Sequence, residues 1–442
     1  MRASRSAKRR IASILVVITA VGATIYWWPP PPLPDYRGVD FGLDGTANSV
    51  FASDKLLAFE FEVQAQDLQN MRDHAREELS VPAKLQVGTQ SVGMVGLRYK
   101  GSTGTLNSVL DERQTESYMP KLSMKIEFDK LEAGKRFCQL RRLNFHSMIY
   151  DGSLMRDRLC YQAFRDAGVI APRCSHAMII INGEYVGVFA MVEQIDQAFV
   201  QDRFVETANS ILYKEVWPIH RNQRPYEQKQ RWNPGNRTHQ AMMGFARDLQ
   251  AATDDDLPAV VAKRTDLDAL LRYFIIDEAL KNWDGVRGWT SKTADSAPWN
   301  HNYYWFLSPQ DRLTLIPWDL DSTLKHPGPR DKLRAWHDLD NIETTGHVTN
   351  SKWFAWAPNH DPLTRAVAKH ARGRYQQVAR ELLAGPLNLD HQLRSLDTWH
   401  NQIRATVAND PHLGSLWRWE RRLSDLRANL HAIQAWLTAE SR

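Results

Sequence analysis

Residues 270–321 read LLRYFIIDEALKNWDGVRGWTSKTADSAPWNHNYYWFLSPQDRLTLIPWDLD, and this stretch decides the fold. An apolar helical pattern runs from Leu270 to Asp284. After an insert rich in Gly, Ser and Thr, two short strand patterns, HNYYWFL and RLTLIPW, are joined by the turn SPQD into a hairpin. In chain order, a carboxylate is therefore the last residue of a helix, an Asn lies inside a hairpin, and carboxylates follow a strand. This order suits a site for a divalent cation and a phosphorylated ligand.

Four side chains in this stretch are candidates for such a site. Asp284 lies at a helix C-terminus, where the dipole disfavours negative charge, so a cation would compensate it; a plain Asp-Gly turn is the alternative. Asp319 and Asp321 follow a strand two positions apart and can converge on one ion, or simply cap a turn. Asn302 is an amide among aromatic residues and needs partners, which a cation or a neighbouring loop would supply. His301 has no second His at ligand spacing, which argues against zinc.

The charge of the chain is concentrated at its N-terminus. The 442 residues include 56 Lys and Arg against 51 Asp and Glu, and five of the basic residues lie within positions 1–10 without any acid. The rest of the chain is therefore formally neutral. A neutral body argues against a nucleic-acid-binding protein.

The next segment, residues 11–28, carries no charge and is long enough as a helix to cross a bilayer. Together with the basic tail 1–10 it predicts a single membrane anchor, with the N-terminus cytoplasmic and the body outside. Residues 29–55, rich in Pro, Gly and Asp, form a linker. The alternative is a secreted protein, cleaved from a signal peptide near Val21-Gly22-Ala23.

The three cysteines, Cys138, Cys160 and Cys174, lack metal-finger spacing. Cys160 lies on the apolar side of a helical pattern, which favours burial over chemistry. A Cys160–Cys174 disulfide in an oxidising compartment is the alternative.

Residues 56–214 are dominated by strand patterns, and the AMIIINGEYVGVFAMV hairpin has an Asn-Gly pair typical of a type I′ turn. The expected elements are a strand at 57–63, a helix at 65–79, a hairpin at 84–99, a strand at 121–128, a helix at 151–167 and a hairpin at 177–192.

Residues 215–442 are mainly helical. We expect a long loop over 215–237 and, after the opening hairpin, helices at 362–383, 389–408 and 415–441. The predicted fold class is therefore α+β, with a β-rich N-terminal lobe at 56–214 and a helical C-terminal lobe at 215–442.

The strand KLSMKIEF places Lys121 and Lys125 on one polar face. Such a face is either exposed to solvent or part of a phosphate clamp beside the small-residue loop 101–105. Glu193, directly after the return strand of the Asn-Gly hairpin, either pairs with such a lysine or faces solvent.

These stretches together resemble the spore coat protein H (CotH-type) kinase family, an atypical branch of the protein-kinase-like fold. The similarity runs from about Leu56 to the C-terminal helices. It is carried by RYKGSTGT, PKLSMKIEF, RRLNFHSMIYDGSLMRDRLCYQAFRDAGVIAPR, INGEYVGVFAMVEQID, ILYKE, NWDG, HNYYWF and IPWDLD. The resemblance implies a bilobal, kinase-like arrangement of the two lobes.

The resemblance also implies roles for single residues. Asp284 is similar to the catalytic-loop Asp, which orients or deprotonates the acceptor hydroxyl. Asp319 resembles the metal-binding Asp of ordinary kinases, and Asn302 resembles the second metal ligand. Lys125, or with less support Lys121, would contact the nucleotide phosphates.

Two further roles follow from position alone: Glu193 as the partner of that lysine, and Lys214 as an additional phosphate contact. One departure is plain, since the helix after Asp151 has no central Glu to pair with the lysine.

The resemblance implies a phosphotransferase that uses ATP with Mg²⁺ or Mn²⁺ and acts on a protein or other acceptor with a Ser/Thr-type hydroxyl. A catalytically silent, kinase-like scaffold for envelope or surface assembly is the alternative. A transferase acting on a non-protein acceptor would keep the same site.

Overall fold

The computed structural model describes residues 14–19, 22–27, 31–101, 106, 121–293, 295–325, 336, 347–348 and 354–442. The chain forms two compact units, each discontinuous in sequence. Unit 1 comprises residues 1–155, 174–192 and 396–424, and unit 2 comprises residues 156–173, 193–395 and 425–442. A mixed α+β fold is confirmed, whereas the kinase-like bilobal arrangement stays a prediction. The predicted lobes, 56–214 and 215–442, are continuous segments and differ from these units.

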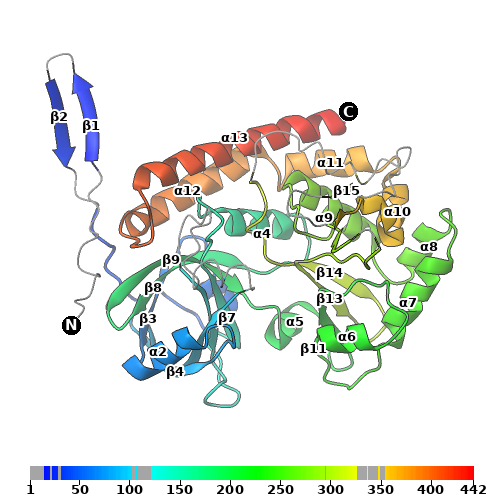
Figure 1. The fold of residues 1–442 in the computed structure, drawn as a ribbon, viewed down its shortest axis with the longest axis horizontal. Helices are drawn as coiled ribbons and strands as arrows, with labels where there is room; N and C mark the ends of the chain where they lie inside the picture. The colour runs from blue at the N-terminus through cyan, green and yellow to red at the C-terminus, as the bar shows by residue number, and fades with distance from the viewer. Residues whose placement is uncertain are drawn as a thin grey trace. The chain divides into compact units, whose positions relative to one another are not determined.

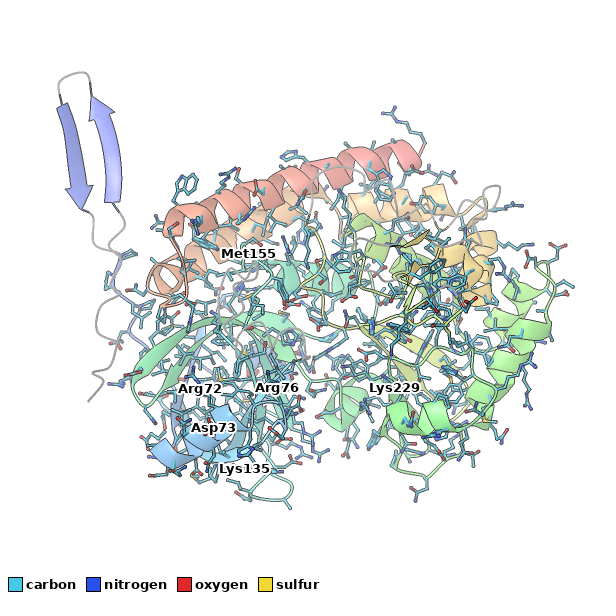
Figure 2. All side chains as sticks on the ribbon, in the orientation of Figure 1. Arg72, Asp73, Arg76, Lys135, Met155 and Lys229 are labelled. Carbon is cyan, nitrogen blue, oxygen red and sulfur yellow. The ribbon has the colours of Figure 1, made fainter. Side chains whose placement is uncertain are left out.

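Unit 1 is built on a closed barrel of seven strands in the order β3-β4-β5-β6-β7-β9-β8 (Figure 1). Neighbouring strands are antiparallel except β3 and β8, which pair in parallel and so close the barrel. The strands are β3 Leu57–Glu62, β4 Val81–Val87, β5 Gln90–Lys100, β6 Ser123–Glu127, β7 Arg142–His146, β8 Cys174–Ile181 and β9 Glu184–Glu193. The helices α1 Ala47–Val50 and α2 Ala65–Asp73 also belong to unit 1, and Arg72 and Asp73 of α2 are labelled in Figure 2.

The barrel interior is filled by the apolar side of each alternating strand pattern. In β6, Met124 and Ile126 are buried while Lys125 is only partly so, which confirms the predicted alternation there. Lys121, predicted on the same polar face as Lys125, is instead buried. Phe59 and Phe145 meet edge to face with ring centroids 5.0 Å apart. Each fully buried side chain of this size contributes roughly 1.5–3 kcal/mol.

The Asn-Gly turn between β8 and β9 is confirmed, since Asn182 and Gly183 both have positive φ, at 52° and 80°. The side chain of Asn182 also accepts a hydrogen bond from Val63 N at 2.8 Å and donates one to Val63 O at 2.9 Å. This turn therefore ties the hairpin to the end of β3.

The prediction of a membrane-spanning helix over 11–28 is wrong for the described residues of that segment. Ile14–Thr19 and Gly22–Trp27 form the antiparallel strands β1 and β2. β1 is rich in β-branched residues and β2 contains Thr24, Ile25, Tyr26 and Trp27, residue types that favour strands, while Gly22 disfavours a helix. No helix in the described part of the chain is long and apolar enough to cross a bilayer.

Unit 2 contains a four-stranded sheet in the order β11-β10-β13-β14, formed by Gln230–Trp232, Ile211–Lys214, Tyr303–Leu307 and Leu313–Pro317. A small second sheet has the order β12-β16-β15 (Thr290–Ser291, Phe354–Ala355 and His347–Val348). The predicted hairpin of β13 and β14 is confirmed, with Tyr303 opposite Pro317 and Leu307 opposite Leu313. The expected long loop at 215–237 instead contains α6 (Arg224–Lys229) and β11. Pro225 lies in the first turn of α6, where proline favours a helix start, and β11 forms by pairing with the edge of β10.

The helices that lie wholly in unit 2 are α5 Gln197–Arg203, α6, α7 Gln240–Ala251, α8 Leu257–Ala262, α9 Leu267–Ala279, α10 Pro362–Ala371 and α11 Tyr375–Ala384. α4 (Arg156–Asp166) also belongs to it, and the short turn η2 spans Pro358–His360. The chain then continues through α12 (Leu389–Ala408) and α13 (Leu416–Glu440). The expected helix 362–383 is divided into two, because Gly373 adopts φ +76°.

The three cysteines are buried thiols. The predicted burial of Cys160 is therefore confirmed, and the alternative Cys160–Cys174 disulfide does not form. Cys160 Sγ lies 3.1 Å from Thr323 Oγ1.

Candidate functional site

Asp284 lies in a turn beyond the end of α9. The helix ends at Ala279, five residues earlier than the apolar pattern suggests, because Lys281 takes a left-handed φ of 51°. Asn302 Nδ2 donates to both Asp284 Oδ2 and Asp284 O, each at 3.0 Å. The Asn that the sequence marked as needing partners therefore holds the carboxylate of Asp284.

The β13–β14 hairpin brings Asn302 and Asp319 to the same end of the sheet. Asn302 precedes β13, Asp319 follows β14, and Trp318 N donates to Asn302 O at 3.1 Å, which extends the ladder by one step. Both residues have positive φ, 62° for Asn302 and 53° for Asp319. Non-glycine residues held in this conformation cost free energy and cluster at functional sites.

Helix α4 fixes the segment that carries Asp319. Tyr161 Oη accepts a hydrogen bond from Asp319 N at 2.9 Å, and Asp157 Oδ1 accepts one from Leu320 N at 3.3 Å. Arg156 Nη1 donates to Asp321 O at 3.4 Å. Three side chains from the first turn and a half of α4 thus bind backbone atoms of three consecutive residues, 319–321.

We call Asp157, Asp284, Asn302, Asp319 and Asp321 the acidic site. Burial raises the pKa of Asp284, and the nearby Asp319 carboxylate raises it further, while His301, the Asn302 hydrogen bond and Lys325 oppose the shift. Burial also raises the pKa of Asp321 well above its usual range, helped by Asp319 and Asp157. Burial is the main cause of both shifts, and the neighbouring carboxylates add to it.

The donor set of the acidic site fits a hard divalent cation. Carboxylate and amide oxygens are the ligands that Mg²⁺ prefers. Such a cation would offset the burial that raises the pKa of Asp321 and the added repulsion from Asp319 and Asp157. Among the described residues, no group of three or more His, Cys, Asp or Glu side chains is arranged to hold a metal ion. Mg²⁺ does not require one, because it is commonly held by one or two carboxylates together with phosphates and water.

The two candidate lysines lie in unit 1 and differ in environment. Lys121 is buried, with Nζ 2.8 Å from Asp410 Oδ2, 2.5 Å from Val188 O and 4.5 Å from the Phe189 ring centroid. Burial lowers its pKa, which Asp410 opposes. Its ammonium group is thus already bound within unit 1.

Lys125 lies opposite Arg98 and Asn144 in the ladders of β6. Burial lowers its pKa well below the usual range, and Lys100, Arg98 and Arg142 add to this, with Glu78 opposing. Within the described part of the chain, no hydrogen bond or ion pair holds its ammonium group. Of the two lysines, Lys125 is the one with an ammonium group left to bind an anion.

Glu193 lies in unit 2 and is bound by two arginines. Its Oε1 accepts from Arg173 Nη2 at 2.5 Å, and its Oε2 accepts from Arg203 Nη2 at 2.6 Å and from Arg173 N at 3.0 Å. Both carboxylate oxygens are bound by arginines and Glu193 is buried, so the alternative that it faces solvent is wrong. The pairing with a lysine stays a prediction.

Lys214 ends β10, where it lies opposite Tyr304. Its Nζ is 3.5 Å from Glu215 Oε1, and Lys229, labelled in Figure 2, reaches Glu215 Oε2 at 3.7 Å. The loop 101–105 expected beside the lysine strand lies, apart from Gly101, outside the described residues.

Sequence reasoning missed Asp157, Tyr161 and Lys325. Asp157 and Tyr161 are four residues apart and so share one face of a helix, which was the available signal. Lys325 lies with Nζ 5.2 Å from the Trp283 ring centroid and 3.1 Å from Ser322 Oγ, and nothing in its sequence context marks it.

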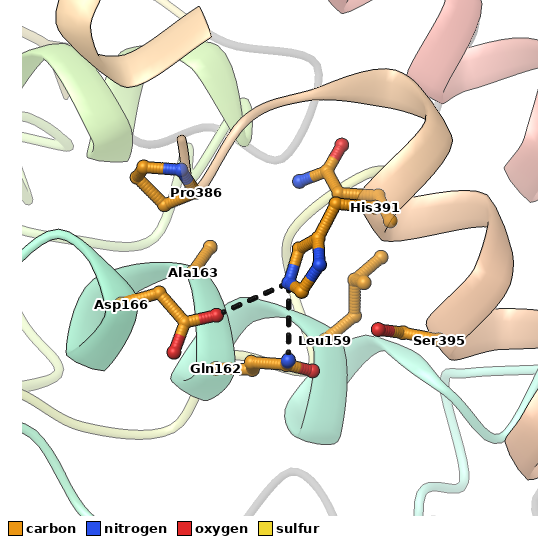
Figure 3. Close-up of a pocket in the computed structure, with 8 residues that line it drawn as sticks. Leu159, Gln162, Ala163, Asp166, Pro386, His391 and Ser395 are labelled. Carbon is orange, nitrogen blue, oxygen red and sulfur yellow. Dashed lines mark hydrogen bonds and ion pairs between the residues drawn. The ribbon is translucent and has the colours of Figure 1, made fainter. Parts of the chain in front are cut away.

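A shallow depression elsewhere in unit 2 is lined by residues of α4, Pro386 and the start of α12 (Figure 3). There His391 Nε2 lies 3.3 Å from Asp166 Oδ2 and 3.4 Å from Gln162 Nε2. It shares no residue with the acidic site.

Comparison with known proteins adds an independent observation. Residues 97–439 match the family described as "CotH kinase protein". The inner spore coat protein H of Bacillus subtilis (strain 168) is 23% identical over 365 residues, which cover 79% of this chain and 87% of that protein.

Among solved structures, the Shewanella oneidensis MR-1 toxin–antitoxin complex of HipA, HipB and operator DNA is similar over 68% of this chain and 60% of that chain. The sequence identity is 11% and the TM-score 0.28, which is too low to support an argument about fold.

Proposed function

Because the chain belongs to the CotH kinase protein family, we propose that it transfers the γ-phosphoryl group of ATP to a Ser/Thr-type hydroxyl on a protein or other acceptor. The observation that carries the proposal is the convergence of Asp284, Asn302 and Asp319. These residues come from the end of a helix and the two open ends of a hairpin, yet they share hydrogen bonds and charge interactions.

Asp284 would act on the acceptor hydroxyl. Asn302 binds its Oδ2, and no hydrogen bond to its Oδ1 is found in the part of the chain that the structure describes. Oδ1 would accept the hydroxyl proton while the hydroxyl oxygen forms a bond to the γ-phosphorus and the bond to the leaving diphosphate oxygen breaks. The raised pKa of Asp284 makes it a stronger base than an ordinary Asp.

Asp319, Asn302 and Asp321 would hold Mg²⁺ or Mn²⁺. When bound, the cation supplies neutralisation of phosphate charge and polarisation of the phosphoryl oxygens. Tyr161 and Asp157 hold the backbone of the metal-binding segment, so the ligands are preorganised before the cation arrives.

Lys125 is the lysine that we assign to the nucleotide phosphates, because cations surround it and its own ammonium group is unpaired within the described residues. The ammonium group of Lys121 is bound to Asp410, so we assign Lys121 a structural role in unit 1 and no contact with the nucleotide. Lys214 remains a candidate for a further phosphate contact.

The test is transfer of labelled γ-phosphate from ATP to a panel of hydroxyl-bearing acceptors, with Mn²⁺ or Mg²⁺ added. We expect turnover by the wild-type chain and a loss of at least about 10²-fold in Asp284→Asn and Asp319→Asn, as for removal of a single charge-stabilising group. No turnover by the wild type, or unchanged turnover in both variants, would contradict the proposal.

Cation binding is tested separately by thermal melting. A cation at about 100 times its Kd should stabilise the wild type by about 2.7 kcal/mol, whereas Asp319→Asn should gain little. Arg237→Gln, at the opposite end of the β13–β14 hairpin, is the matched control and should respond like wild type. An equal response by Asp319→Asn would contradict the assigned ligand.

The name of the Bacillus relative, an inner spore coat protein, supports a second candidate: a kinase-like scaffold for surface assembly. The scaffold predicts that surface assembly continues when the Asp284→Asn variant replaces the wild-type chain. A phosphotransferase whose product is needed for assembly predicts that assembly fails with this variant.

A further inference from the structure

The loop that carries Asp284 is anchored to buried charges at the end of α9. Asp277 Oδ1 accepts from Asn282 Nδ2 at 2.7 Å, and Asp277 Oδ2 accepts from Arg287 Nε at 2.9 Å. The Asp277 carbonyl also accepts from Asn282 N at 3.0 Å. The side chains of Asp277 and Arg287 are 0% and 1% exposed. The Asp277 carboxylate therefore binds the loop on both sides of Asp284, at Asn282 and at Arg287.

The far side of the loop is held by the hairpin. Asn300 Nδ2 donates to Val286 O at 2.8 Å, and Tyr303 Oη donates to Asn300 Oδ1 at 2.8 Å. Together with the bonds from Asn302, these contacts fix the loop between α9 and β13.

Glycines let the loop lie this close to its anchor. A Cβ at Gly285 would lie 2.3 Å from Asn282 Nδ2 and 2.9 Å from Asp277 Oδ1, and one at Gly288 would lie 2.1 Å from Trp283 O. The loop therefore packs directly on the polar group that holds it, and has little room to shift without breaking these bonds.

The buried Arg287 side chain is poorly suited to stabilising the fold, because its hydrogen bonding is incomplete. Its Nη1 and Nη2 are buried without a hydrogen bond among the described residues, and Nη1 lies 4.0 Å from Glu278 Oε1. A buried ion pair with incomplete hydrogen bonding pays a desolvation cost that an apolar pair of similar volume avoids. A directional role explains the pair better, because it fixes both flanks of Asp284 relative to α9.

We infer that Asp277 and Arg287 are positioning residues that hold Asp284 in place for the proposed phosphoryl transfer. The inference rests on the proposed function for its effect on turnover, but the anchoring of the loop can be measured without turnover. Neither residue contacts the reacting atoms in this assignment, and both act through Asn282 and the backbone of residues 282–288.

The decisive variant is the double substitution Asp277→Leu/Arg287→Met, which removes both charges and so avoids leaving one buried charge unpaired. We expect its melting temperature to lie closer to wild type than that of Asp277→Leu alone. Its kcat should fall by about 10²-fold, the cost of misplacing a reacting group by about 1 Å, with the KM for ATP unchanged. Asn282→Ala should also lower kcat, although this substitution changes no charge.

Hydrogen–deuterium exchange provides the readout that needs no activity. Amides of residues 282–288 should exchange faster in the double variant, while α9 and the β13–β14 hairpin keep their protection. Arg237→Gln is the control, since this arginine binds Ser308 O and Asp311 at the hairpin turn, and should leave both kcat and the exchange of 282–288 unchanged.

The outcomes separate the two proposals. Wild-type kcat in the folded double variant, or unchanged exchange of residues 282–288, would overturn the positioning role. Absence of wild-type turnover would instead overturn the phosphotransferase, and the exchange result alone would then decide whether the pair anchors the loop.

Discussion

At the scale of single residues, the acidic site depends on side chains placed where their local chemistry is unfavourable. Asn302 and Asp319 have positive φ, and Asp284 and Asp321 are carboxylates whose burial disfavours the charged form. Each cost is offset by a specific partner, such as Asn302 for Asp284 and Tyr161 for the backbone at 319.

Glu278 provides a residue-scale prediction about pH. Burial raises its pKa to about 7, with Arg287 and a hydrogen bond from Trp336 Nε1 opposing and Glu440 and Asp277 reinforcing the shift. The folded state therefore binds this proton more tightly than the unfolded state. The contribution to stability is fully present below about pH 4.5 and is lost as pH rises through about 7, a change of about 3 kcal/mol.

Glu278→Gln should remove this dependence and make the protein more stable than wild type at pH 8, because Gln keeps an acceptor for Trp336 without a charge. Denaturant unfolding of both proteins between pH 5 and 8 measures the effect. Parallel stability curves for the two proteins would show that Glu278 does not titrate in this range.

At the scale of elements, a buried ion pair in unit 1 links the loop after α12 to the barrel. Asp410, in the loop after α12, accepts from Lys121, which lies just before β6, and from Val188 N of β9 at 2.9 Å. Gly187 makes the approach possible, because a Cβ there would lie 2.4 Å from Asp410 Oδ2. The pair thus joins two barrel strands to a segment more than 200 residues away in sequence.

Asp410→Ala should destabilise unit 1 by about 3–5 kcal/mol, because it leaves the Lys121 ammonium buried without its counter-charge. The free energy of unfolding from denaturant titration measures the loss. Lys121→Met/Asp410→Leu should recover most of it, since an apolar pair needs no counter-charge. Equal losses in the single and double variants would mean that the backbone bond from Val188, and not the charge pair, carries the stability.

At the scale of the whole molecule, each compact unit collects segments that are distant in sequence. Unit 1 needs residues 396–424 from near the C-terminus, and unit 2 needs residues 156–173 from between two barrel strands. The chain therefore cannot be cut once into two complete units.

A fragment of residues 56–214 should fail to fold by itself, because it lacks Asp410 and the rest of 396–424 while keeping Lys121 buried. Its circular dichroism should show no cooperative melting transition. Co-expression with residues 215–442 should restore one. A cooperative transition in the isolated fragment would contradict this dependence.

The amino-acid sequence alone determined the α+β class, the alternation of β6, the Asn182-Gly183 turn and the β13–β14 hairpin. These features depend on neighbours in the chain: periodicity decides which face is buried, and turn residues decide where φ can be positive. Asp284 and Asp319 were also visible because each is a polar residue at an element's end, and Asn302 was visible because it is an amide among aromatic residues.

Only the tertiary structure decided how charges are paired. In the structure, Lys121 pairs with Asp410 and Glu193 pairs with two arginines. Helix α9 ends before Asp284, and strands replace the helix expected near the N-terminus. Asp157 and Tyr161 lie at the acidic site. Pairings of this kind join residues far apart in sequence, and their strength depends on burial and distance. Local composition fixes neither, so the acids of Leu270–Asp321 could be found in the sequence but their partners could not.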